Sequence, residues 1–293
     1  MRPSGSQWFE MPSPFGDGTQ RLFLLEPPTA CAGELRCRLL DETYGRPYVV
    51  EDGDWRYLHF DQRLVQSAMR LAAPNALEVR YTQKMMSCLL FRPQPRRIVL
   101  IGLGGGSLAK FCHVRLPAAQ VCVVESNRDV IALRDAFQVP ADGPRFEVVE
   151  ADGAAYLAGA GKGIDLLLVD AFDRHGFADS LATEAFFGQA GAKLAGGGVL
   201  AVNLAGDKQR YVGVVATAMQ VFDDRCILLP VREDDNRVLL AFNDAAFQPD
   251  WRRLRNRARE LRARHGLDFP AFLALIERSV KRDLAGREAG HGR

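Results

Sequence analysis

Arg96-Arg-Ile-Val-Leu-Ile-Gly-Leu-Gly-Gly-Gly-Ser-Leu-Ala-Lys110 is the stretch that decides the fold. Residues 98–101 form a continuous apolar run, which is typical of a strand buried on both faces of a parallel sheet. A glycine turn follows, and residues 107–113 then resume with a helical pattern. Glycine lets a ligand approach the backbone, and the start of a helix offers free N–H groups. Strand, turn and helix in this order therefore predict a cradle for a phosphate or a nucleoside.

The candidate cradle residues are Gly102, Gly104 and Gly106, but their spacing lacks one glycine of the dinucleotide fingerprint G-x-G-x-x-G. The next unit strengthens the interpretation. A second apolar run, residues 120–124, is followed by Glu125, nineteen residues after Gly106. A carboxylate at this position suits a bidentate grip on the 2′,3′-diol of a ribose. The alternative is a coincidental βαβ unit with an exposed Glu.

Length and composition place the chain among ordinary globular proteins. Its 293 residues, 47% apolar and 25% charged, suffice for one large domain and a smaller one. The net charge of +2 favours no particular partner. Six cysteines include no C-x-x-C pair, and no metal site is predicted. We find no signal peptide and no apolar run of membrane-spanning length, so a cytoplasmic protein without membrane contact is expected.

Changes in composition divide the chain into four parts. We expect a flexible arm at 1–20, a small β domain with helices at 21–92, a Rossmann-like nucleoside-binding catalytic domain at 93–245, and a basic helical extension at 246–293. In the second part, short β-type runs are followed by two helical patterns. The predicted strands are 21–25, 37–40, 46–51 and 55–60, and the predicted helices are 64–71 and 78–91.

From Arg97 onward strands and helices alternate, which predicts a doubly wound α/β sheet. The expected strands are 97–101, 120–125, 145–150, 164–169 and 197–203, and the expected helices lie near 106–114, 127–136, 180–194 and 208–222. The last two apolar runs, 226–231 and 237–242, are separated by five residues. Such a short connection cannot carry a parallel crossover, so it predicts an antiparallel hairpin. That ending is a methyltransferase-type feature and argues against a plain NAD-binding fold.

The C-terminal part is basic. Residues 250–293 contain twelve Lys and Arg against six Asp and Glu. Trp251, Leu254, Ala258 and Leu261 fall on one stripe of a predicted helix, with arginines elsewhere. We favour a surface helix that covers the sheet over a nucleic-acid interface, because a run of charges is usually a solvated face.

Acidic residues follow three successive strands of the predicted sheet. Glu125 ends the second strand, Asp152-Gly153 follows the third, and Asp170 and Asp173 follow the fourth. Ligands of open α/β sheets bind outside the carboxyl ends of the strands. Asp152 could instead cap a helix, and Asp173 could begin a turn. Together with the glycine loop, these acids predict a site for a cationic nucleoside.

At these residues the chain resembles the spermidine synthase (polyamine aminopropyltransferase) family. Gly198-Val-Leu-Ala-Val-Asn203 is similar to the family's fifth strand, and the segment from Asp170 to Phe187 resembles its gate loop, D-S-x-D…L-[FY]-T-x-E-F-[FY]. The resemblance covers roughly residues 44–245. It implies a small N-terminal β domain, a Rossmann-like methyltransferase fold and a homodimer. It also implies transfer of an aminopropyl group from decarboxylated S-adenosylmethionine to a diamine.

The resemblance implies roles for individual residues. Glu125 would hold the ribose, and Asp152, followed by Gly153, would bind the adenine amino group. Asp170 would take the proton from the attacking amine. Asp173 would help to bind the cationic acceptor.

Several positions depart from the family pattern. The Asp of the family's G-G-G-D-G-G loop falls on Gly105, and the Pro after the second gate-loop Asp is Arg174. Aligned without gaps, the family's D-G-x-x-Q places Arg56 at a donor-contacting position. Its Y-H-E-M places Val65-Gln-Ser-Ala68 in the pocket, which makes Gln66 a further candidate for donor binding. We therefore expect the nucleoside half to be kept and the amine-binding half to be altered.

The leading hypothesis is aminopropyl transfer to a small amine or an amino-acid-like acceptor. The alternatives are a methyltransferase that uses intact S-adenosylmethionine and a non-catalytic nucleoside- or polyamine-binding protein. Because Gly105 replaces an acid, and Arg56, Arg174 and His175 add positive charge, putrescine is expected to be a poor acceptor. Arg56 could instead pair with a substrate carboxylate, or point to solvent.

Overall fold

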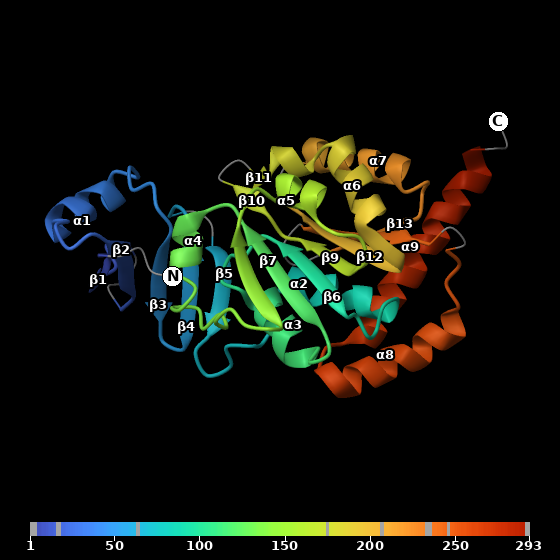
Figure 1. The fold of residues 1–293 in the computed structure, drawn as a ribbon, viewed down its shortest axis with the longest axis horizontal. Coiled ribbons are helices and arrows are strands. Elements are labelled where there is room, and N and C mark those ends of the chain that lie inside the picture. The colour runs from blue at the N-terminus through green and yellow to red at the C-terminus, as the bar shows by residue number, and fades with distance from the viewer. Residues whose placement is uncertain are drawn as a thin grey trace.

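Two sheets make up the protein in the computed structural model, which describes residues 5–15, 19–62, 65–173, 176–205, 208–231, 236–244 and 247–290 (Figure 1). The N-terminal sheet has five antiparallel strands in the order β1-β2-β3-β4-β5. Their bounds are Gln7–Pro12, Arg21–Glu26, Tyr48–Asp52, Trp55–His59 and Val65–Arg70. The predicted small antiparallel sheet is confirmed.

Both faces of the N-terminal sheet contribute to a hydrophobic core, because successive side chains of a strand point to opposite faces. Leu22 and Leu24 of β2 pack with Leu35 and Leu39 of helix α1 (Ala32–Leu40). Leu25 points to the other face, into the core shared with the large sheet. The N-terminal sheet therefore packs directly against the large sheet.

Two predictions for the start of the chain are wrong. The flexible arm expected at 1–20 contains β1, which pairs with β2 from Gln7 to Pro12. Its Phe9 and Met11 pack against the α1 cluster, and this apolar contact outweighs the Pro- and Gly-rich composition of the arm. The strand expected at 37–40 belongs to α1, because Leu35 and Leu39 lie one helical turn apart on its buried face.

A third prediction, a helix at 64–71, is also wrong. Residues 65–70 form β5, which pairs antiparallel with β4. The backbone hydrogen bonds offered by the edge of β4 decide the conformation of this short segment, as tertiary context often does. The predicted helix at 78–91 is confirmed as α2 (Arg80–Met85) followed by a 3-10 turn, η1 (Met86–Leu90).

The large sheet has seven strands in the order β13-β14-β12-β9-β6-β7-β8. In that order the strands are Cys226–Pro230, Arg237–Asn243, Leu194–Leu204, Ile164–Val169, Arg97–Ile101, Gln120–Glu125 and Phe146–Glu150. The β6, β7, β8, β9 and β12 pairings are parallel, whereas β14 runs antiparallel to both of its neighbours. The predicted doubly wound sheet with a C-terminal antiparallel hairpin is confirmed.

Helices cover both faces of this sheet (Figure 1). They are α3 (Ser107–Arg115), α4 (Arg128–Ala132), α5 (Gly153–Gly159), α6 (Glu184–Lys193) and α7 (Lys208–Val221), with a short η2 (Asp179–Leu181). The central strand shows why both faces are apolar. Ile98 and Leu100 face the core under α3, whereas Val99 and Ile101 face the core under α5, α6 and α7. A separate small hairpin consists of β10 (Phe172–Asp173) and β11 (Gly176–Phe177).

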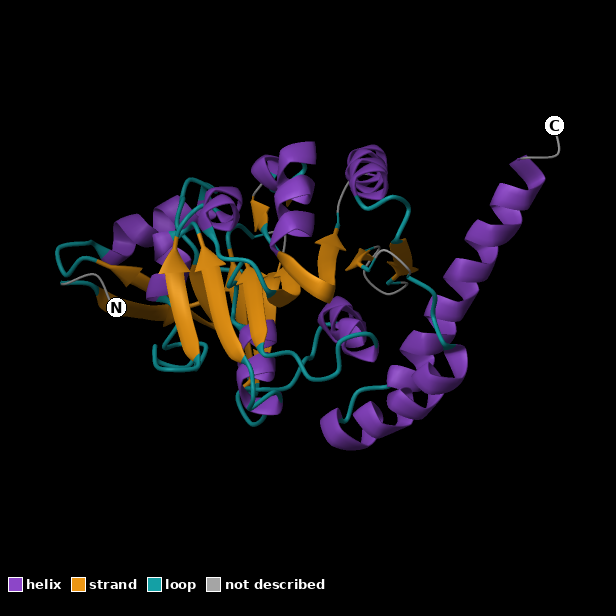
Figure 2. Cartoon of the chain, turned by 45° about the vertical axis from the view of Figure 1, so that its right-hand side comes forward, coloured by secondary structure: helices purple, strands orange, loops and turns teal. Residues whose placement is uncertain are grey.

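The C-terminal extension consists of α8 (Trp251–His265) and α9 (Phe269–Gly290), and α9 extends away from the body of the molecule (Figure 2). The predicted stripe is confirmed, because Leu254, Ala258 and Leu261 are buried and most arginines of α8 are exposed. In the part of the chain that the structure describes, no helix is long and apolar enough to cross a membrane.

Candidate functional site

A cavity of about 1470 Å³ lies at the carboxyl ends of β6, β7 and β9, facing β5 of the N-terminal sheet. Its described lining contains one guanidinium, that of Arg46, which pairs with Glu26 and Asp129 at 3.1 and 2.6 Å. Six carboxyl side chains line the same cavity: Glu42, Asp61, Glu125, Asp152, Asp170 and Asp179. The described wall is therefore strongly acidic, which favours a cationic ligand.

The glycine loop joins β6 to α3 at the floor of this cavity. Gly102 has a φ of +97°, and a Cβ there would lie 2.1 Å from the carbonyl oxygen of Asp170. Only glycine allows this approach, which brings the ends of β6 and β9 together. Gly102 and Gly104 line the cavity. Gly106 is not among the lining residues. At a φ of +69° it is the N-cap of α3 and lies against Val139.

Glu125 lies at the end of β7 and lines the cavity. Its Oε2 accepts a hydrogen bond from the backbone N–H of Leu103, and its Oε1 accepts one from Asn127, both at 2.8 Å. These bonds fix the carboxylate between the glycine loop and the following turn. Each oxygen keeps a second lone pair, so the geometry fits a diol donor such as a ribose.

Asp152 and Gly153 also line the cavity. Asp152 is the N-cap of α5: its Oδ1 accepts from the N–H of Ala155 at 2.9 Å, and its Oδ2 accepts from the hydroxyl of Ser180 at 3.1 Å. Asp152 therefore does cap a helix, and the capping hydrogen bond orients its carboxylate at the cavity wall. A Cβ on Gly153 would meet Ile101 at 2.4 Å, so a larger residue would displace the cap.

Asp170 follows β9, and side chains hold both of its carboxyl oxygens. Oδ1 accepts from the amide of Asn203 at 2.9 Å, and Oδ2 accepts from the hydroxyl of Tyr81 at 3.1 Å. Burial raises the pKa of the Asp170 carboxyl above its ordinary value, although both hydrogen bonds lower it. A carboxyl group with a raised pKa in an open cavity is suited to accept a proton.

Three residues of this site are absent from the prediction. Tyr81 lies in the first turn of α2, Asn203 lies in β12 and Asn236 precedes β14. All three line the cavity. A signal for Tyr81 exists in the sequence, because Tyr81-Thr-Gln-Lys-Met85 resembles the family's Y-H-E-M once a gap is allowed. The gap-free alignment placed that motif at Val65, on β5.

The structure places Arg56 away from the residues that line the cavity, and its contact with the donor stays a prediction. Arg56 is not among the residues that line the cavity; it lies on β4, where its guanidinium pairs with Glu51 and donates to the carbonyl of Ala136. Glu51 and Arg56 are cross-strand partners of β3 and β4, so a local ion pair takes the side chain. Gln66 does line the cavity, which leaves it in place as a donor-binding candidate.

Gly105 is a true departure from the family loop. A Cβ there would lie 2.6 Å from the hydroxyl oxygen of Ser67 and 3.0 Å from the ring of Phe137. Ser67 of β5 therefore fills the space into which an Asp side chain would begin. For Asp173, the structure describes the backbone in β10 and not the side chain, so its role stays a prediction. Arg174 and His175 lie outside the described residues.

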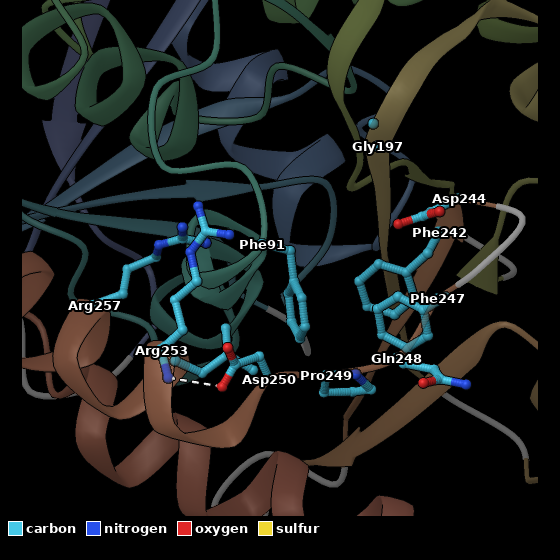
Figure 3. Close-up of a pocket in the computed structure, with 12 residues that line it drawn as sticks. Phe91, Gly197, Phe242, Asp244, Phe247, Gln248, Pro249, Asp250, Arg253 and Arg257 are labelled. Carbon is cyan, nitrogen blue, oxygen red and sulfur yellow. Dashed lines mark hydrogen bonds between the residues drawn. The ribbon is translucent and has the colours of Figure 1, made fainter.

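A second cavity, of about 210 Å³, lies at the opposite end of the sheet, near the start of β12. Figure 3 shows Arg253 and Arg257 on one side of it and three phenylalanine rings on the other. Phe242 and Phe247 are stacked with centroids 3.9 Å apart. None of the residues predicted for the nucleoside lines this cavity, and the carboxyl-end cavity is the candidate site.

The chain is similar to known proteins in both sequence and structure. No protein-family profile matches the chain. It is 38% identical over 244 residues to a polyamine aminopropyltransferase of Chromobacterium violaceum, a match that covers 83% of this chain and 92% of that protein. A probable spermidine synthase from Corynebacterium glutamicum has a TM-score of 0.61 at 20% identity, over 74% of this chain and 84% of that one. Human methyltransferase-like protein 13, in complex with SAH, has a TM-score of 0.59 at 19% identity, over 64% and 93%.

The two solved structures show the methyltransferase-like fold, and the curated relative matches most of both chains in sequence. The family resemblance predicted from the fifth strand and the gate loop is thereby confirmed. The chain belongs to the polyamine aminopropyltransferase family.

Proposed function

We propose that this protein transfers an aminopropyl group from a decarboxylated S-adenosylmethionine-type donor to a small amine. One observation carries the proposal. Asp170, with both carboxyl oxygens fixed and a raised pKa, faces the same acidic cavity as the glycine loop, Glu125 and Asp152. The relative from Chromobacterium violaceum is named for the same activity.

The nucleoside half of the cavity fits the donor. Gly102 and Gly104 leave the backbone open to a ligand, Glu125 offers two oriented oxygens to a ribose, and Asp152 offers an acceptor to an adenine amino group. The donor, when bound, supplies an electrophilic carbon beside its sulfonium. Gln66 lines the wall between the glycine loop and β5, and it contributes amide donors and acceptors there.

Asp170 acts on the acceptor in this proposal. An aliphatic amine is protonated at neutral pH and cannot attack in that form. The Asp170 carboxylate binds the ammonium, takes one proton at an oxygen and leaves a neutral amine. Tyr81 and Asn203 hold the carboxylate so that its remaining lone pairs face the cavity. The acidic wall concentrates cations, and the enzyme contributes chiefly by positioning them.

The expected weakness toward putrescine loses one of its premises, because Arg56 lies outside the cavity wall. The described lining carries six carboxyl groups against the paired guanidinium of Arg46, which suits a diamine. Gly105 still lacks the family's acid. We therefore propose a small diamine or triamine as the acceptor, with its chain length open to measurement.

The test is direct. The purified protein is incubated with decarboxylated S-adenosylmethionine and, separately, 1,3-diaminopropane, putrescine, cadaverine or spermidine. Mass spectrometry then follows methylthioadenosine and the extended amine. Equal amounts of the two products, lost in Asp170→Asn, are expected.

Two other outcomes would replace the proposal. Formation of S-adenosylhomocysteine from intact S-adenosylmethionine, with no methylthioadenosine, would identify a methyltransferase. Tight nucleoside binding without turnover of any donor would identify a non-catalytic binding protein. The homodimer implied by the family is also a proposal, and light scattering of the eluted protein measures it.

A further inference from the structure

A chain of side-chain amides leads away from Asp170 through the sheet. Asn203 donates to Asp170 Oδ1 at 2.9 Å through its Nδ2, and Asn236 donates to Asn203 Oδ1 at 3.1 Å through its own Nδ2. Asn203 is 2% exposed and Asn236 is 8% exposed. Two buried amides in series, one on β12 and one directly before β14, are costly unless their hydrogen bonds are satisfied.

The orientation of the Asn203 amide decides what Asp170 experiences. With the NH2 group toward Asp170, the amide donates to the carboxylate and favours its ionised form. After a half-turn, the amide would present its oxygen to Asp170, which would favour the protonated form. The two orientations differ little in shape, so the hydrogen-bond partners on the two sides of the amide decide which one is populated.

Asn236 is the group that makes this selection. Its Nδ2 donates to Asn203 Oδ1, and an Asn203 amide with Oδ1 toward Asn236 directs its NH2 group to Asp170. The Asn236 backbone is itself fixed, because its carbonyl accepts from the N–H of Val231 and from the guanidinium of Arg237. Tyr81 of α2 is the titratable group that contacts Asp170 among the described residues, on its other oxygen.

We propose that Asn236 is a positioning residue that holds the proton acceptor Asp170 in its ionised, oriented form by fixing the Asn203 amide. This proposal rests on the proposed function, since it assigns Asp170 as the base of that reaction. Asn236 acts through Asn203 and does not need to touch either substrate. Its replacement should therefore change the pH at which the enzyme works more than its maximal rate.

The test compares Asn236→Asp and Asn236→Ala with wild type across the acidic limb of kcat/KM. Asn236→Asp replaces the donor with an acceptor and forces the Asn203 amide to turn. The acidic limb of the pH profile should move up by about one pH unit. At a pH on this limb, kcat/KM should then fall ~10-fold, while its value on the pH-independent plateau stays within ~3-fold. Asn236→Ala removes the donor that faces Asn203 Oδ1 but introduces no acceptor in its place. A smaller shift of the limb in the same direction is expected.

Asn243→Ala is the matched control. Asn243 lies at the other end of β14, where its amide donates to the carbonyls of Leu194 and Ala195 at 3.0 and 3.2 Å. Its loss should lower the melting temperature and leave the acidic limb in place. An unmoved limb in both Asn236 variants, or an equal shift in Asn243→Ala, would overturn the proposal.

A second measurement separates this proposal from the proposed function. Carboxyl-labelled aspartate in the whole protein allows NMR titration of Asp170, assigned by its absence in Asp170→Asn. A higher midpoint in Asn236→Asp supports the positioning role even if no aminopropyl transfer is found. Transfer by the wild type with an unchanged Asp170 midpoint in both Asn236 variants would keep the function and reject the role.

Discussion

The two halves of the large cavity hold their carboxylates in different ways. Backbone N–H groups of the glycine loop and the following turn fix Glu125, and its two hydrogen bonds come from residues close to β6 and β7. Side chains from α2 and β12 fix Asp170, and a further side chain before β14 supports one of them. The proposed nucleoside half is therefore held by local backbone, and the proposed reacting half by distant side chains.

This difference has a functional consequence. A carboxylate held by backbone amides keeps its geometry whatever side chains surround it, which suits recognition of a constant nucleoside. A carboxyl held by side chains can be adjusted by single substitutions, which suits a base whose pKa must match its task. Substitutions in the two halves should therefore separate affinity from turnover.

The largest effect is expected for Asp170→Asn. The change keeps the shape and removes the proton acceptor, so turnover should fall ~10²-fold or more. Methylthioadenosine affinity, measured by calorimetry, should stay within ~3-fold because Glu125 is untouched. Near-normal turnover with a confirmed acceptor would remove Asp170 from the reacting half.

Glu125→Ala tests the other half. Loss of a charged hydrogen-bond partner should weaken methylthioadenosine binding by ~1.5–3 kcal/mol, about ten- to a hundredfold. Glu150→Ala is the matched control. Glu150 lies opposite Glu125 in the register of β7 and β8, and it is not among the residues that line the cavity. Equal affinities for both variants and wild type would remove the ribose role.

Tyr81→Phe should have a moderate effect confined to the reacting half. Its hydroxyl lowers the pKa of Asp170, so its loss should raise that pKa further. Because Asp170 must be ionised to accept a proton, activity falls as the pH drops through this pKa, and the acidic limb should move to higher pH. Turnover near the limb should fall roughly 3- to 10-fold. A uniform loss at all pH values would argue for a steric role instead.

The smallest effect is expected for Arg56→Gln. The structure places Arg56 in an ion pair with Glu51, so donor affinity should change less than ~2-fold. The preference for decarboxylated over intact S-adenosylmethionine should also be unchanged. A thermal melt should show a loss of about 1 kcal/mol from the broken pair. An altered donor preference would return Arg56 to the site.

Sequence alone determined the large sheet and the nucleoside half of the site. Continuous apolar runs bounded by turn residues indicate buried strands, and parallel strands bring their carboxyl ends to one edge. Glu125 and Asp152 therefore lie at the same edge of the sheet as the glycine loop. The antiparallel hairpin followed from the short connection between residues 231 and 237.

Tertiary structure decided the rest. Segments such as 37–40 and 64–71 are too short for their hydrophobic pattern to specify helix or strand. Burial of one face of α1 decided the first, and pairing with β4 decided the second. Arg56 turned to Glu51 because two strands happen to pair at that register. Tyr81, Asn203 and Asn236 lie far apart in the chain and meet at Asp170 only through the fold. Periodicity records burial along one element, and it holds no information about which polar side chains of different elements will touch.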